Sequence, residues 1–109
     1  MAHDEGLVEI LRADLADQPN IVEKRMFGGI CFMKDGHMLC GVHSEGGMFR
    51  VGKPRQDAAL AIEGAGPMKF TGRPMGGLVD VTDEALADDT RRGLLMALAL
   101  ENVAELGPR

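Results

Sequence analysis

Two cysteines and two methionines have the clearest potential for chemistry, because they flank a predicted turn. Asp35-Gly36 stands between two apolar runs and favours a two-residue hairpin, since a type I′ turn needs positive φ at both central positions. In that register Cys31 faces Cys40 and Met33 faces Met38, and alternation along the strands puts all four on one side of the sheet. Soft sulfur ligands suit Cu(I), and facing thiols can form a reversible disulfide. Cysteine and methionine are also common core residues, so packing is the simpler interpretation.

The other reactive side chains do not converge on a recognisable site. His37 and His43 fall in one predicted strand at a separation of about 20 Å, so they cannot share a metal ion. Ser44 follows His43, but no nucleophile elbow surrounds it. The glycine pairs at 46–47 and 76–77 form neither a Walker loop nor a dinucleotide-binding turn. We therefore expect no catalytic residue, no metal site and no cofactor.

Helices are predicted at both ends of the chain, with strands between them. Residues 4–16 place apolar side chains at helical spacing, and a second helical stretch runs from residue 82 or 83 to Gly107, with Asp88 or Asp89 capping its main part. The sequence predicts a two-layer α+β fold, in which an antiparallel sheet meander is flanked by N-terminal and C-terminal helices, with a short middle helix. The other elements are expected at 29–33, 38–42, 48–51, 68–70 and 78–81 as strands and at 54–63 as the middle helix.

Length and composition favour one domain over residues 1–109. The chain is 45% hydrophobic and 27% charged, which is a globular balance. No apolar run approaches the roughly 20 residues needed to span a bilayer, and the N-terminus is too acidic for a secretory signal. We expect a cytoplasmic protein that does not contact membranes, with Cys31 and Cys40 reduced.

The net charge of −5 is unevenly distributed along the chain. Residues 24–73 carry eight bases against four acids, whereas the segments on either side are acidic. A basic middle segment favours an anionic partner locally, but the acidic whole argues against strong non-specific binding of nucleic acid. The residues expected to contact a partner are Lys24, Arg25, Phe27, Lys53 and Arg73.

One group of motifs is similar to a known family. The run Arg25-Met26-Phe27-Gly28-Gly29, followed by a short strand, Asp35-Gly36, Met48-Phe49-Arg50-Val51 and Gly72-Arg73-Pro74, resembles the N-terminal domain of the TfoX/Sxy competence regulators. The resemblance covers roughly residues 7–104. It implies an α+β fold with an antiparallel sheet and a connection with competence regulation in bacteria, and it brings no catalytic residues with it.

The chain also departs from that family in two ways. Larger members carry a helical C-terminal domain that this sequence lacks, so we expect a stand-alone module. Aromatic residues common in the family are missing, since Trp and Tyr number zero and places such as residues 30, 78 and 96 hold Ile, Leu and Met.

Three function classes follow from these observations. The preferred hypothesis is a non-enzymatic regulatory module that binds a protein partner, with the transcription machinery as the candidate source of that partner. The alternatives are a nucleic-acid-binding domain that uses the basic middle segment, and a small metal or redox protein that uses Cys31 and Cys40. The scarcity of aromatic residues disfavours the first alternative, because few side chains can stack on bases.

A homodimer is also predicted from the sheet pattern. Both faces of the hairpin carry apolar residues, and helices on one side of a two-layer fold cover only one of them. Phe32 and Leu39 are expected to form the second, exposed face, which another copy of the chain would cover.

Overall fold

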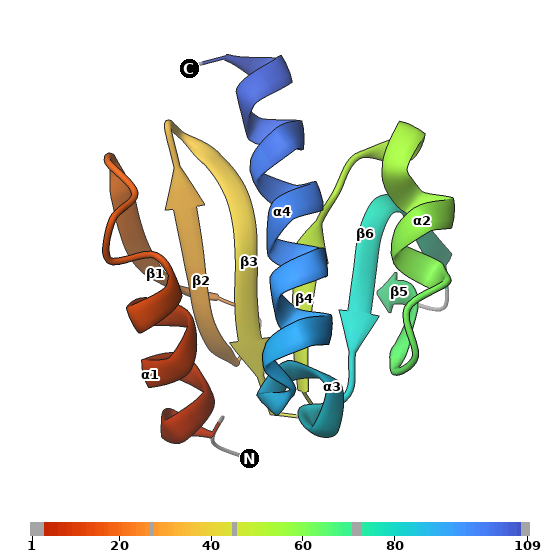
Figure 1. Cartoon of the computed structure of the whole chain (residues 1–109), viewed down its shortest axis with the longest axis horizontal. Helices are drawn as coiled ribbons and strands as arrows, with labels where there is room; N and C mark the ends of the chain where they lie inside the picture. The colour runs from red at the N-terminus through yellow and green to blue at the C-terminus, as the bar shows by residue number, and fades with distance from the viewer. Residues whose placement is uncertain (1–3, 27, 45, 71–72, 108–109) are drawn as a thin grey trace.

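A six-stranded antiparallel sheet organises the chain, and helices lie across one of its faces (Figure 1). The computed structural model describes residues 4–26, 28–44, 46–70 and 73–107. The strands follow the order β1-β2-β3-β4-β6-β5, so the first four form a meander. Their bounds are β1 Ile21–Met26, β2 Gly29–Lys34, β3 His37–His43, β4 Gly46–Arg50, β5 Ala65–Phe70 and β6 Arg73–Val81. The helices are α1 Glu5–Asp14, the 3-10 turn η1 Lys53–Arg55, α2 Gln56–Leu60, α3 Asp83–Ala87 and α4 Asp89–Leu106. This arrangement confirms the predicted fold class.

The β2–β3 hairpin turns where predicted but changes register beyond its tip. Asp35 and Gly36 have φ values of 52° and 86°, as a type I′ turn requires. Met33 pairs with Met38, but the register then shifts by one residue. Beyond the shift Cys31 pairs with Gly41 and Phe32 with Cys40, so Leu39 is the extra residue of a β-bulge. The predicted pairing of Cys31 with Cys40 is therefore wrong.

The bulge turns two consecutive side chains of β3 toward the helices. Leu39 and Cys40 are both fully buried in the main core, together with Phe32. The prediction that Phe32 and Leu39 form an exposed dimer face is wrong, because the chain's own helices cover them. The prediction that Cys40 shares a face with Cys31 fails for the same reason, since Cys31 belongs to a separate cluster on the other face.

The helical layer covers this main core through regularly spaced apolar side chains. Asp4 caps α1 by accepting from the amides of the first turn, and Asp88 caps α4 in the same way. Gly47 of β4 lets α3 approach closely, because a Cβ there would lie 2.7 Å from Leu86. None of the described helices is both long enough and apolar enough to cross a membrane. The helix side chains in the core are Leu7, Val8 and Leu11 of α1, Ala59 of α2, Ala85 and Leu86 of α3, and Leu95, Met96, Ala99 and Val103 of α4.

Several elements differ from their predicted bounds. The predicted middle helix at 54–63 is a 3-10 turn followed by the short helix α2, and the predicted last helix is divided at Asp88 into α3 and α4. Strands β5 and β6 form a longer hairpin than the predicted runs at 68–70 and 78–81. The sequence predicts no separate strand at β1, because the residues Val22–Arg25 show no apolar alternation. In the structure these four of its six residues are exposed.

Candidate functional site

The sheet face opposite the helices carries its own apolar group, which we call the sulfur cluster. It consists of Cys31, Met48 and Leu78, with Met33 and Met38 packed against them. Its members come from β2, β3, β4 and β6, and no described helix contributes a side chain to it. The predicted gathering of sulfur atoms thus exists, but Met48 occupies it in place of Cys40.

The more exposed apolar residues of this face lie near the Asp35-Gly36 turn and on β1. Cys31 and Met48 are 0% and 1% exposed, whereas Met33 and Met38 are partly exposed and Val22 is 54% exposed. The register places Val22 beside Met33 and Met33 beside Met38. These three residues, the methionine row, form a line of accessible apolar side chains across three strands.

The environment of Cys31 suppresses thiol chemistry near neutral pH. Burial raises the pKa of Cys31 to about 11, although the neighbouring charge of Lys24 acts in the opposite direction. Its Sγ lies 3.9 Å from Met33 Sδ. Burial raises the pKa of Cys40 well above its ordinary value on the other face of the sheet. Both thiols are free, and the described residues hold no group of three His, Cys, Asp or Glu side chains that could bind a metal ion.

The predicted basic contact residues are distributed over distant parts of the sheet. Lys24 and Arg25 are exposed neighbours on β1 and therefore point to opposite faces. Lys53 lies in η1 beside Gly76 of β6, and four strand spacings, about 19 Å, separate β1 from β6. Arg73 begins β6, where only its backbone is described, and Phe27 lies outside the described residues. Lys24, Arg25 and Lys53, the predicted contact residues whose side chains are described, therefore do not form a single patch.

The two histidines of β3 make separate contacts. His43 Nε2 lies 2.7 Å from Asp80 Oδ1, and His37 Nε2 lies 2.7 Å from the Gly107 carbonyl oxygen at the end of α4. A shallow depression of about 350 Å³ adjoins Asp80, but backbone and small side chains of residues 64–67 and 80–82 line most of it. Its polar side chains are Asp80, which contacts His43, and Thr82, whose hydroxyl accepts from the Ala85 amide as the cap of α3, so both have structural contacts.

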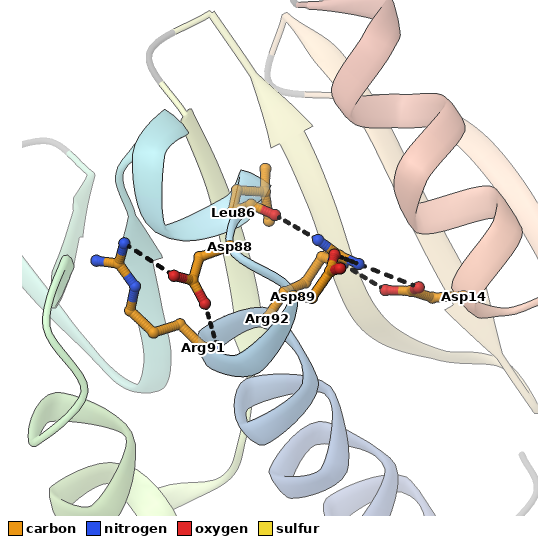
Figure 2. Close-up of polar contacts among 6 residues, drawn as sticks. All are labelled: Asp14, Leu86, Asp88, Asp89, Arg91 and Arg92. Atoms are coloured by element: carbon orange, nitrogen blue, oxygen red, sulfur yellow. Dashed lines mark hydrogen bonds and ion pairs between the residues drawn. The ribbon is translucent and has the colours of Figure 1, made fainter.

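A buried arginine connects three helices beneath the outer surface, as Figure 2 shows. Arg92 is 6% exposed, and its Nε donates to Asp14 Oδ2 at 2.6 Å. Its other nitrogens donate to Asp89 Oδ1 at 2.8 Å and to the Leu86 carbonyl oxygen at 3.1 Å. Because every guanidinium nitrogen has a partner, this network stabilises the junction of α1, α3 and α4. The sequence contains its signal, since Arg92 shares the buried stripe of Leu95.

These observations define a small α+β domain with one helix-covered sheet face and one face that carries an accessible methionine row. The sequence model of the TfoX N-terminal domain matches residues 13–103, so the chain belongs to the TfoX N-terminal domain family. Comparison with curated proteins and with solved structures gave no significant match. The family match confirms the resemblance inferred from the sequence motifs.

Proposed function

We propose that this domain is a non-enzymatic regulatory module that binds a protein partner in the cytoplasm through its methionine row and acts in transcriptional regulation. The observation that carries this proposal is the accessible line of Val22, Met33 and Met38 on the face that no described helix covers. Family membership supports the regulatory part.

The chemistry of the methionine row favours a protein partner. Methionine side chains are flexible and polarisable, so they adapt to the apolar surface of a partner. Lys24 lies next to the row on the same face, where it is paired in register with Cys31. Its ammonium group can form an ion pair with an acidic residue of the partner at the edge of the row. Lys24 and Arg25 lie far from Lys53 and the net charge is −5, which disfavours a nucleic-acid surface.

The test compares two substitutions on opposite sides of the molecule. Met38→Asp places a charge in the methionine row, and Leu94→Asp places the same charge on an exposed apolar residue of α4. Each variant replaces the native gene, and thermal unfolding verifies that both proteins fold. We expect Met38→Asp to reduce co-purified partner at least tenfold and to reproduce the transcript changes of the gene deletion, whereas Leu94→Asp should retain wild-type behaviour.

Two results would contradict the proposal. Equal loss of partner in both variants would show that the methionine row has no special role. Nanomolar, salt-sensitive binding to DNA that disappears on charge reversal at Lys24 and Arg25 would favour the nucleic-acid alternative instead.

A further inference from the structure

The two edges of the sheet differ in how well they are protected against pairing with another strand. At one edge, β5 contains Pro67, and its register with β6 shifts between Pro67 and Lys69. Proline and irregular register are the usual features that block an edge. At the other edge, β1 pairs with β2 in continuous register over all of Ile21–Met26, and its sequence contains neither proline nor glycine. β1 is therefore the edge that can accept another strand.

The hydrogen bonds of β1 show which of its peptide groups remain available. The Asp35 amide donates to the Asn20 carbonyl oxygen at 3.3 Å, just beyond the β1–β2 ladder. Along an antiparallel strand the backbone N–H and C=O groups of successive residues alternate in direction, so the backbone groups of the even-numbered residues of β1 point to β2. Those of Ile21, Glu23 and Arg25 consequently point away from the sheet. Residues 22–25 are also exposed as side chains, so a second strand can reach them.

We propose that two copies of this chain associate by antiparallel pairing of their β1 strands, with Lys24 on the two-fold axis. The two-fold axis must be perpendicular to the sheet, since it relates neighbouring antiparallel strands. Directly opposed residues then point to the same face, so an odd-numbered residue can oppose only another odd-numbered residue. This geometry restricts the possible registers to those that are centred on a residue.

Charge selects one of these registers. Centring on Lys24 puts Glu23 opposite Arg25 of the second copy, twice by symmetry, and puts Val22 opposite Met26 of the second copy. Centring on Glu23 would oppose two glutamates, and centring on Arg25 would oppose two arginines. Opposite charges across a strand pair stabilise it and like charges destabilise it, so the Lys24 register is favoured despite its single Lys24–Lys24 contact.

The existing contact of Glu23 is compatible with this pairing. Arg12 of α1 donates to both Glu23 carboxylate oxygens at 2.7 Å, and the Glu23 side chain remains 35% exposed. A carboxylate has about four acceptor positions, so Arg25 of the second copy can join the same group. The pairing would also place the two methionine rows on the same face of the joined sheet. A short strand edge buries little area, so we expect a dissociation constant on the order of micromolar.

A cysteine placed on the two-fold axis tests the register directly. In the Lys24 register the two Lys24 Cα atoms lie about 4.5 Å apart as a non-hydrogen-bonded pair, which is within disulfide range. Because Cys31 lies opposite position 24 in the β1–β2 register, the test uses a Cys31→Ala background for both the variant and its control. In that background Lys24→Cys should form a disulfide-linked dimer in a glutathione redox buffer. The matched control is Val22→Cys, whose two copies would lie about 14 Å apart and should remain uncrosslinked. Equal crosslinking of both variants would overturn the proposal.

Two charge variants provide an independent test by sedimentation equilibrium. Lys24→Gln removes the Lys24–Lys24 repulsion on the axis and should strengthen association roughly twofold to fivefold. Arg25→Glu places a glutamate opposite Glu23 of the second copy, twice by symmetry, and should weaken association roughly tenfold. A non-specific charge effect predicts weakening in both cases, because each substitution makes the acidic chain more negative. Self-pairing would be refuted if the wild-type protein and the Lys24→Gln variant both remained monomeric at about 500 µM, which is well above the expected micromolar dissociation constant.

Discussion

Both faces of the sheet carry apolar residues, but the two groups differ in size and in what covers them. On the covered face, Phe32, Leu39 and Cys40 pack under α1, α3 and α4 in one continuous core (Figure 1). On the other face, Cys31 and Met48 are closed over by the sheet's own side chains, and the surrounding methionines remain accessible. The larger buried cluster lies on the covered face, so we expect stability to depend mainly on that face.

The largest expected effect tests this division directly. Phe32→Ala removes a fully buried ring from the covered face and should lower the free energy of unfolding by about 3–5 kcal/mol. Met38→Ala removes a partly exposed side chain from the methionine row and should cost less than about 1 kcal/mol. Denaturant unfolding of both variants measures the difference. Similar losses would show that the two faces contribute equally to stability.

A second, smaller effect concerns the polar network within the helical layer. Arg92→Ala should lower the free energy of unfolding by about 2 kcal/mol, because Asp14 loses its buried partner at the end of α1. The loss is limited, since Asp14 and Asp89 can turn to water. Arg91→Ala is the matched control, because Arg91 is more exposed and its contacts lie at the surface. Circular dichroism during urea unfolding compares the two, and equal destabilisation would contradict a specific role for Arg92.

The hairpin shows how far the sequence can predict this fold. Asp35-Gly36 predicts the turn correctly, because its two positive φ values follow from local backbone preferences. The bulge at Leu39 has no such local signal, since it arises when Leu39 and Cys40 both pack against helices that are distant in sequence. One extra residue changes the face of every side chain beyond it, so the predicted place of Cys40 in the sulfur group and the predicted dimer face are both wrong.

The candidate site was predictable only where its residues lie close to the turn, whose conformation follows from local sequence. Met33 and Met38 flank the turn before the bulge, so their pairing was predicted correctly. Val22 was missed because β1 is an edge strand, where charged residues replace the apolar alternation that identifies strands. The predicted basic residues lie on elements that the sheet order separates, and linear clustering of charge does not reveal that order.

The smallest expected effect concerns thiol ionisation, which should differ between Cys31 and Cys40 because they lie on opposite faces of the sheet. The unfolded Cys31 thiol has an ordinary pKa of 9.0, and burial raises the folded value to about 11. The unfolded state therefore loses this proton first as pH rises, so the contribution of Cys31 to stability is complete below pH 9 and is lost progressively toward pH 11.

Between pH 8 and pH 10 this loss should amount to about 1 kcal/mol, and Cys31→Ser should reduce the pH dependence by that amount. Alkylation by iodoacetamide provides a second measurement on the native protein. Cys31 should react before Cys40 as pH approaches 11, because Lys24 stabilises the Cys31 thiolate, whereas burial and the neighbouring charges of Cys31 and Asp14 all raise the pKa of Cys40. Lys24→Gln should delay the reaction of Cys31 without changing that of Cys40. Simultaneous modification of both thiols would show that alkylation requires global unfolding. The reactivity of the two cysteines would then not depend on the face of the sheet that each occupies.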